Sequence, residues 1–399
     1  MKYAVVIPDG AADWPLEDRG GKTCFELARK PNLDAMASDG RVGLASTVPE
    51  GMEPSSACAC MSIMGYDPAV YFTGRGPIEA KSLGLQLEEN EVALRCNFVT
   101  IEDGKMRSFN AGHITDAESH PIIETLNKEL GNERIRFHLG VGYRHILTIK
   151  DGVECLDALC TPPHDIPNQP MDRYLPQGEG NGLLFELMEK SIAILANHPV
   201  NRERISSGKL PATTIWLFWG GKGIADFPSF SERFGLKAAM TSGVGLLEGL
   251  ADLTGMTVLK IPGVTDNIDN DYAAQGNGAL QALSDHDLVF VHVEAPDESG
   301  HEALTDEKIK SIEQIDELII SQLRARNDLR VLVMPDHPTP IKIKTHVREP
   351  VPFVLWGPGF EGNGAQSFSE NSGKSTDLFI EHGHDLIRTL TKAKSPTDT

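Results

Sequence analysis

The sequence predicts an α/β protein with a doubly wound, mostly parallel sheet and an inserted α+β segment, and three observations lead to this prediction. Short, almost wholly apolar runs alternate with stretches of helical periodicity, as expected when helices cover both faces of a parallel sheet. Between residues 85 and 195 this pattern gives way to alternating apolar and polar residues, which is typical of strands with one face in solvent. The length of 399 residues also exceeds that of one ordinary domain.

The elements of the predicted core follow one another in strand–helix order. Residues 3–10 (YAVVIPDG) predict a first strand, and residues 24–40 carry the helical pattern that follows it. A longer helix is predicted at 305–326, because Ile309, Ile312 and Ile315 recur there at helical spacing. Further core strands are predicted at the apolar runs of residues 211–221, 255–263, 287–295, 329–337 and 350–359.

The inserted segment contains elements of another kind. Residues 92–109 and 143–156 predict strands, and the EDGK and KDGV sequences within them predict hairpin turns. A proline-rich stretch at 160–180 then leads into a predicted helix at 183–198. The segment is therefore expected to form an α+β unit of its own.

These patterns predict a discontinuous core with one inserted domain. The core is expected to comprise residues 1–84 and 196–399, and the inserted domain residues 85–195. The return to the core at 161–182 is rich in proline and glycine. We therefore expect the inserted domain to act as a substrate-binding lid that moves relative to the core and closes over a ligand.

The composition excludes several classes of partner. The chain carries 57 Asp and Glu against 37 Lys and Arg, a net charge of −20, which argues against binding to nucleic acid or to anionic membranes. No apolar run approaches the roughly 18 residues needed to span a membrane, and MKYAVVIPDG is too short for a signal peptide. The six cysteines show no zinc-ribbon spacing. We interpret them as reduced thiols of a cytoplasmic protein.

Acidic and histidine side chains gather where the predicted strands end, which is the edge at which open parallel sheets bind ligands. They are Asp9, Asp297, His301, Asp336, His337 and, just before the last predicted strand, His346. One such residue alone is typical of a turn or a helix cap, but six together predict a metal centre. Mixed Asp and His ligands suit Mn²⁺, with Zn²⁺ and Mg²⁺ as alternatives. Six ligands exceed the usual set of one ion, so we expect two ions, which can clamp a phosphoryl group between them.

A candidate nucleophile precedes an apolar helical pattern in residues 50–68 (EGMEPSSACACMSIMGYDP). A serine at the start of a helix is often only its cap. The same position also stabilises a phosphorylated serine, because the helix amides and dipole attract negative charge. A serine bound to a metal ion becomes a competent nucleophile.

Several motifs together resemble the cofactor-independent phosphoglycerate mutases, and most closely their archaeal-type branch within the alkaline phosphatase superfamily. The resemblance spans nearly the whole chain. It rests on the Asp-Gly after the first strand and on the motifs PSSACACMSIMGYDP, GRGPIEA, YRHIL, TPPHDI, YLPQGEG, HPVN, VHVEAPDESGH, PDHPTP and THVREPVPF. It implies an alkaline-phosphatase-type core with an inserted lid.

The resemblance also implies roles for individual residues. Asp297, His301 and His346 would hold one Mn²⁺-type ion, and Asp9, Asp336, His337 and the nucleophile the other. Alignment of MSIMGYDP with the family's Ser-x-x-Gly-Tyr places the nucleophile at Ser56 and not at Ser55 or Ser62. The chain departs from the family at three positions: Ala57 replaces an Asp, Cys60 replaces an Asn, and Asn277 follows Gly276 where a Tyr-x-Gly-Lys-Ala motif carries Lys.

The activity implied is the interconversion of 3- and 2-phosphoglycerate, a glycolytic isomerisation, through a phosphoserine at Ser56. The small phosphorylated substrate would be held by polar residues of or near the lid: Arg75, His113, Arg144 and His164. Members of the branch have also been proposed as homoserine kinases, so a phosphotransferase of that kind is the alternative. A phosphatase and a non-enzymatic metal-binding protein are the other two hypotheses.

Overall fold

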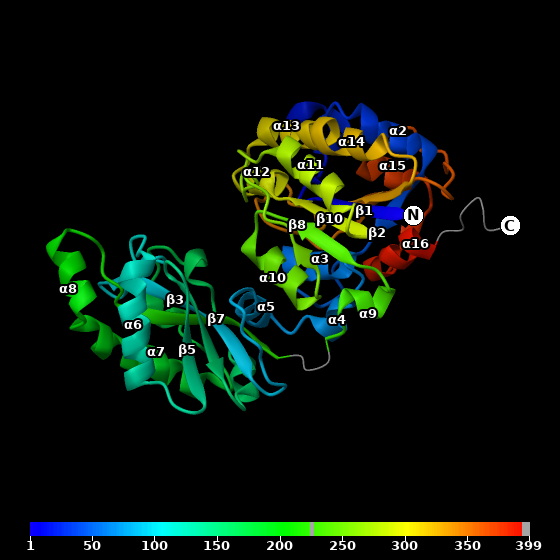
Figure 1. Ribbon diagram of the computed structural model, residues 1–399. Helices are drawn as coiled ribbons and strands as arrows, with labels where there is room; N and C mark the ends of the chain where they lie inside the picture. Colours follow the sequence, from blue (N-terminus) through cyan, green and yellow to red (C-terminus); the bar gives the residue numbers. More distant parts are fainter. Residues whose placement is uncertain (224–226, 393–399) are drawn as a thin grey trace. The chain divides into compact units, whose positions relative to one another are not determined.

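The computed structural model describes residues 1–223 and 227–392 (Figure 1). The chain divides into two compact units. Unit 1 comprises Met1–Phe72 with Phe227–Thr399, and unit 2 comprises Thr73–Asp226. Unit 2 is thus inserted into a discontinuous unit 1.

Unit 1 is built on an eight-stranded sheet. In spatial order the strands are β13 (Phe379–Ile380), β2 (Arg41–Ala45), β12 (Val351–Trp356), β11 (Leu329–Val333), β1 (Lys2–Pro8), β10 (Leu288–Val293), β8 (Ala238–Thr241) and β9 (Thr257–Val258). Strand β1 lies between β10 and β11 and is parallel to both, and β8 is parallel to β10. Every residue of β10 and of β11 is buried, as expected for strands covered on both faces.

Helices cover the two faces of this sheet. Figure 1 shows α2, α11, α13 and α14 on one side and α3, α9 and α10 on the other. The helices of unit 1 are α1 (Cys24–Leu27), α2 (Pro31–Asp39), α3 (Ser56–Ile63), α4 (Pro68–Tyr71), α9 (Phe230–Phe234), α10 (Gly245–Leu253), α11 (Tyr272–Ala282), α12 (Ala295–His301), α13 (Thr305–Ile315), α14 (Ser321–Arg324), α15 (Glu370–Ser375) and α16 (Leu386–Lys392). A π-helical turn, Asp316–Ile320, joins α13 to α14, and 3₁₀ turns occur at Glu17–Arg19 and Gly383–Asp385. The predicted fold class, a doubly wound and mostly parallel α/β sheet, is confirmed.

Strand β12 runs antiparallel to both its neighbours, β11 and β2. Residues 334–350, which connect β11 to β12, contain no helix. Because a parallel strand needs a crossover connection, usually a helix, the chain here can only reverse its direction. The amino end of β12, and not its carboxyl end, therefore lies at the edge of the sheet where β1, β10 and β11 end.

Unit 2 is an antiparallel sheet with helices on both faces. Its strands are β3 (Val92–Glu102), β4 (Lys105–Ser108), β5 (Ile135–Val141), β6 (Arg144–Ile149) and β7 (Thr214–Lys222), and β3 pairs with β4, β6 and β7. Its helices are α5 (Arg75–Ser82), α6 (Asp116–Glu129), α7 (Asn181–Ala196) and α8 (Pro199–Ser206), with 3₁₀ turns at Val153–Asp157, Pro163–Asp165 and Met171–Arg173. The main apolar core joins sheet residues such as Phe98 and Trp216 to Ile122 of α6 and Leu187 of α7. This is the α+β insertion that the alternating pattern predicts.

Three details of the insertion differ from prediction. Its boundaries lie at 72/73 and 226/227 instead of 84/85 and 195/196, because α5 and β7 both pack on β3. Residues 211–221, predicted as a core strand, form β7 of unit 2, since an apolar run alone does not reveal which sheet buries it. The EDGK turn does form a hairpin, with φ of 50° at Asp103 and 72° at Gly104. The prediction of a hairpin turn at KDGV was wrong, because the chain enters a 3₁₀ turn after β6.

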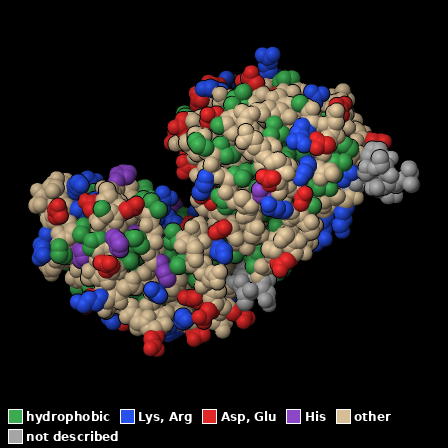
Figure 2. Space-filling model, viewed as in Figure 1, with side chains coloured by type: hydrophobic (Ala, Val, Ile, Leu, Met, Phe, Trp, Pro, Cys, Tyr) green, Lys and Arg blue, Asp and Glu red, His purple; other side chains and the backbone are tan. Residues whose placement is uncertain are grey.

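The surface carries charges of both signs. Acidic and basic side chains are interspersed over the face of the molecule shown in Figure 2. Among the described residues, no helix combines the length and the apolar character needed to cross a membrane.

Candidate active site

The structure places the predicted metal-site residues at the carboxyl edge of the core sheet. Asp9 follows β1, Asp297 lies on α12 directly after β10, and Asp336 follows β11. Because these three strands are parallel neighbours, their carboxyl ends meet and the three carboxylates emerge side by side. His346 precedes β12 and is returned to this edge only because β12 is antiparallel.

The first group of side chains joins Asp297, His301 and His346. Nε2 of His301 lies 3.0 Å from Asp297 Oδ2, and Nε2 of His346 lies 3.4 Å from Asp297 Oδ1. The two Nε2 atoms are 2.8 Å apart. Nδ1 of His301 is 3.0 Å from the carbonyl oxygen of Lys344, and Nδ1 of His346 is 3.3 Å from that of Pro54.

These contacts fix which nitrogen of each ring carries the proton. A carbonyl oxygen only accepts, so each Nδ1 must be the donor, and each Nε2 presents a lone pair once it carries no proton of its own. The two Nε2 atoms and the carboxylate therefore point at one another, an arrangement that needs a cation among them, either a proton on Nε2 or a metal ion that takes its place. The three residues thus fit a divalent metal ion.

The second group is centred on His337, whose Nε2 meets three oxygen atoms. It lies 3.2 Å from Ser56 Oγ, 3.1 Å from Asp336 Oδ2 and 3.7 Å from Asp9 Oδ1. Oδ1 of Asp336 accepts from the backbone N–H groups of Gly10 (3.0 Å) and His337 (2.8 Å), which leaves Oδ2 for another partner. Asp9 Oδ1 is buried and has no hydrogen-bond partner among the described residues. These donor atoms fit a second cation.

Thr339 couples the two groups. Its hydroxyl donates to Asp297 Oδ1 and lies 3.3 Å from Nδ1 of His337. Since a hydroxyl has one proton, Thr339 must accept from Nδ1–H of His337, which leaves the Nε2 lone pair of His337 for the second group. Gly10 makes room for this contact: its φ is +59°, and a Cβ there would lie 2.3 Å from Asp297 Oδ1.

The electrostatics of the cluster favour the uptake of cations. Burial, together with the Asp336 and Glu294 carboxylates, raises the pKa of Asp9 well above its usual value. Burial alone would also raise the pKa of Asp297, but hydrogen bonds with His301 and His346 hold it well below its usual range. The hydrogen bond with Asp297 raises the pKa of His301 to about 9. The neighbouring carboxylates therefore disfavour the ionised form of Asp9, a repulsion that a bound cation would relieve.

The two adjacent serines of the predicted nucleophile segment have different surroundings. Ser55 is the N-cap of α3, and its Oγ accepts from the backbone N–H of Cys58 at 3.4 Å. Ser56 is the first residue of α3, and its Oγ contacts His337. Ser55 therefore caps the helix, whereas Ser56 lies beside the candidate metal ligands. Cys60, at the family's Asn position, has its Sγ 3.9 Å from Asp336 Oδ2, and burial raises the pKa of its thiol well above the usual range.

Sequence analysis missed two polar residues of this cluster, His292 and Glu294. Nε2 of His292 lies 2.6 Å from Asp9 Oδ2 and 3.7 Å from Glu294 Oε2. Burial lowers the pKa of His292 to about 4, so the ring is neutral. The missed signal was a histidine inside the otherwise apolar run LVFVHV, since a buried polar group needs partners.

The family's lysine position also requires a correction. Counted from Tyr272, the fourth residue of a Tyr-x-Gly-Lys motif is Gln275 and not Asn277. Gln275 is fully buried, and its Nε2 donates to the carbonyl oxygen of His292 at 2.8 Å. Asn277 is exposed on α11. A neutral amide beside the cluster therefore stands where the family motif carries a cation.

Unit 2 carries a cluster of basic side chains around one buried carboxylate, that of Glu79. The Arg75 guanidinium stacks 3.6 Å from the ring centroid of Trp219, and its Nη2 lies 3.5 Å from Glu79 Oε1. Arg95 of β3 binds the other oxygen of Glu79. Burial, Arg144 and Arg75 together lower the pKa of Arg95 to about 9. Two guanidinium groups share one carboxylate, so the cluster can attract a further anion such as phosphate.

The other predicted substrate-binding residues of unit 2 are only partly gathered here. The ring of His164 lies 5.3 Å from that of Trp219, and Arg144 stands opposite Asn97 in the β3–β6 pairing. His113 is exposed in the loop after β4, where its backbone N–H donates to Asn110 Oδ1 at 3.2 Å. Arg95 was missed, although an arginine inside the apolar strand VALRCNFV is a signal of the same kind as His292.

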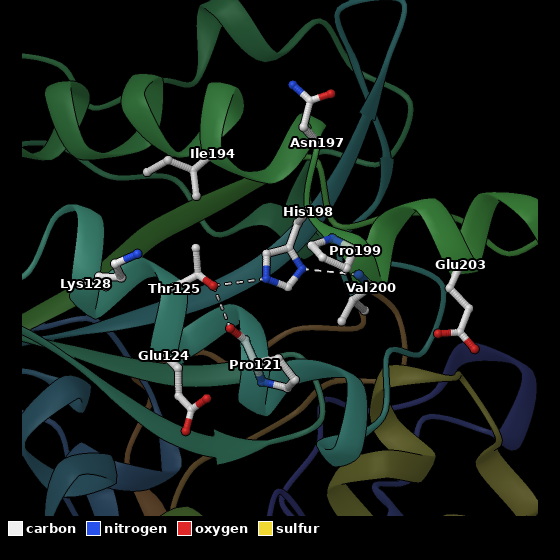
Figure 3. Close-up of a pocket in the computed structure, with 10 residues that line it drawn as sticks. All are labelled: Pro121, Glu124, Thr125, Lys128, Ile194, Asn197, His198, Pro199, Val200 and Glu203. Atoms are coloured by element: carbon white, nitrogen blue, oxygen red, sulfur yellow. Dashed lines mark hydrogen bonds between the residues drawn. The ribbon is translucent and has the colours of Figure 1, made fainter.

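A groove of about 680 Å³ lies elsewhere on unit 2, between α6, α7 and α8 (Figure 3). Its histidine, His198, caps α8: Nδ1 accepts from the N–H of Val200 at 3.3 Å, and Nε2 lies 3.1 Å from Thr125 Oγ1. Both ring nitrogens are thereby engaged. None of the predicted site residues lines the groove.

Paired carboxylate–imidazole groups and a helix-start serine at the carboxyl edge of a parallel sheet are suited to moving a phosphoryl group. The fold and the cluster together define the class of metal-dependent phosphoryl-transfer enzymes. A family model for 2,3-bisphosphoglycerate-independent phosphoglycerate mutases matches residues 37–201. The chain belongs to this family, in its archaeal-type branch.

Individual relatives support that membership over the full length of the chain. A protein of this name from Methanothrix thermoacetophila is 47% identical over 98% of this chain and 99% of its own length. A probable phosphoglycerate mutase of the same kind from Geobacter sulfurreducens is 42% identical over 98% and 99%. The solved PH0037 protein of Pyrococcus horikoshii has a TM-score of 0.81 at 26% identity, over 98% and 97% of the two chains. The cofactor-independent mutase of Thermoplasma acidophilum has a TM-score of 0.66 at 26% identity, over 98% and 100%.

The family predicted from the motifs is confirmed. The homoserine-kinase alternative finds no support among these relatives.

Proposed function

We propose that the chain interconverts 3- and 2-phosphoglycerate by two phosphoryl transfers through Ser56. In the first, the bond between Ser56 Oγ and phosphorus forms as the bond from phosphorus to the 3-oxygen breaks, and that oxygen takes up the proton that Ser56 gives up. The glycerate then reorients, and its 2-oxygen accepts the group in the reverse sequence. The observation that carries the proposal is the position of Ser56 Oγ, 3.2 Å from His337 Nε2 inside the carboxylate–imidazole cluster.

The proposal includes two divalent ions, with Mn²⁺ preferred and Zn²⁺ or Mg²⁺ as alternatives. Asp297, His301 and His346 would hold one, and Asp9, Ser56, Asp336 and His337 the other. When bound, such ions neutralise phosphoryl oxygens and acidify a coordinated hydroxyl. The protein itself contributes the fixed orientation of each ligand, since each of the three histidines presents Nε2 because its Nδ1 is tied to an oxygen acceptor.

Unit 2 is proposed to be the substrate-binding lid. Its basic cluster suits the carboxylate and phosphate of phosphoglycerate, and closure would exclude water. Exclusion of water matters here because hydrolysis of the phosphoserine is the competing reaction.

The proposal is tested by incubating Mn²⁺-loaded protein with 3-phosphoglycerate alone, and separately with homoserine and ATP, and recording ³¹P NMR spectra. We expect 2-phosphoglycerate to appear without added 2,3-bisphosphoglycerate, with no phosphohomoserine. Formation of inorganic phosphate alone would instead indicate a phosphatase, and phosphohomoserine a kinase; either outcome would overturn the proposal.

Replacing Arg75 with methionine is expected to raise the KM for 3-phosphoglycerate about 10- to 100-fold, because a hydrogen bond to a charged group is worth about 1.5–3 kcal/mol. The turnover number should change less. Steady-state kinetics of the coupled enolase reaction give both values. The matched control is Arg107→Met, since Arg107 is an exposed arginine of unit 2 paired with Glu102. An unchanged KM in Arg75→Met would remove Arg75 from the substrate site.

A further inference from the structure

His292 is a polar residue in the interior of a central strand. It belongs to β10, and 1% of its surface is exposed, while the other residues of the strand are Leu, Val and Phe. A buried imidazole is stable only if its two nitrogens find partners. Its Nδ1 lies 3.0 Å from Ser242 Oγ, and its Nε2 lies 2.6 Å from Asp9 Oδ2.

The direction of these hydrogen bonds follows from their neighbours. Asp9 is ionised when it binds a metal ion, so Oδ2 can only accept, and Nε2 of His292 carries the proton. Ser242 Oγ already accepts from the backbone N–H of Val244 at 3.0 Å, and its own proton is free to be donated to Nδ1. A continuous chain of donors thus runs from the end of β8, through β10, to the residue after β1.

This series of hydrogen bonds determines which oxygen of Asp9 remains available to bind a metal ion. Oδ2 is occupied by His292, whereas Oδ1 is buried, lacks a hydrogen-bond partner among the described residues, and lies 3.7 Å from Nε2 of His337. We propose that His292 is a positioning residue that fixes the Asp9 carboxylate so that Oδ1 alone faces the second ion. This inference rests on the proposed function. Ser242 acts through His292 by setting its tautomer.

A role for His292 as a metal ligand is less consistent with the same contacts. At His301 and His346 the two Nε2 atoms face each other 2.8 Å apart, so a proton or a metal ion must lie between them. At His292 and Asp9 a donor meets an acceptor at hydrogen-bond distance, so this pair is satisfied without an ion, and only Glu294 Oε2, 3.7 Å from the same Nε2, has no hydrogen-bond partner among the described residues. Partners of this kind, which orient a ligand without touching the ion, typically change metal affinity about 10- to 100-fold.

The test compares His292→Leu with His292→Gln. The leucine removes the donor, whereas the glutamine amide offers an N–H at a similar reach. Mn²⁺ titration followed by electron paramagnetic resonance of the free ion gives affinities, and metal analysis at saturation gives stoichiometry. We expect His292→Leu to bind the second ion about 10- to 100-fold more weakly with two ions still bound at saturation, and His292→Gln to restore most of the affinity.

The control is His286→Leu, which should leave Mn²⁺ affinity unchanged. His286 is buried just before the same strand, and its ring nitrogens contact Ala282 and Thr257. If His292→Leu does not fold, Ser242→Ala should weaken the second ion in the same direction. Wild-type affinity in His292→Leu, or the loss of one whole ion at saturation, would overturn the positioning role while leaving the two-ion site intact. Wild-type protein that binds no divalent ion would instead overturn the proposed function and this inference with it.

Discussion

Replacing Ser56 with alanine is expected to reduce turnover by about four orders of magnitude or more, with little change in substrate binding. The substitution removes the oxygen that would carry the phosphoryl group and one donor atom of the second group, where Ser56 Oγ lies 3.2 Å from His337 Nε2. Without a covalent relay, the transfer within one substrate loses the step that divides it into two easier ones. Acid quench within milliseconds of mixing wild-type protein with 3-phosphoglycerate, followed by mass spectrometry of residues 51–75, should place the phosphate on Ser56.

The matched control is the neighbouring Ser55→Ala. Ser55 caps α3, so its loss should lower stability by about 1 kcal/mol and leave turnover within a few-fold of wild type. Phosphate found on Ser55, or full activity in Ser56→Ala, would show that the wrong serine has been assigned.

Replacing His301 with alanine is expected to lower turnover by about three orders of magnitude or more, because a bound ion contributes several kcal/mol of transition-state stabilisation. Metal analysis should find about one ion per chain in place of two. Circular dichroism and thermal unfolding should change little, since His301 ends the short helix α12 and 35% of its side chain is exposed. The lost contacts are those with Asp297 and His346, which belong to the metal group and not to the apolar core.

The comparison for His301→Ala is His120→Ala, an exposed histidine of α6 that pairs with Glu124. It should retain two ions and full turnover. Near-normal turnover together with two bound ions in His301→Ala would be incompatible with the assigned ligand set.

The sequence by itself determined the core elements and most of the candidate ligands. Apolar runs predict β1, β10 and β11 because strands buried on both faces leave no room for polar alternation. Parallel neighbours end at the same edge, so Asp9, Asp297 and Asp336 could be placed together without a structure. Helix periodicity similarly predicted α7 and the α13–α14 segment.

The tertiary structure decided what depends on pairing between distant segments. Residues 211–221 belong to unit 2 because β7 pairs with β3. The sequence of an apolar run does not show with which strand it will pair. His346 reaches the ligand cluster from the start of a strand because β12 is antiparallel, and strand direction is set by the connection and not by the strand's own residues. The role of His292 also depends on tertiary structure. In the sequence it is a single polar residue in an apolar run, and its partners Asp9 and Ser242 come from the ends of neighbouring strands. Local hydrophobicity patterns in the sequence indicate which residues are buried. Side-chain partners are fixed only when strands far apart in sequence pack side by side.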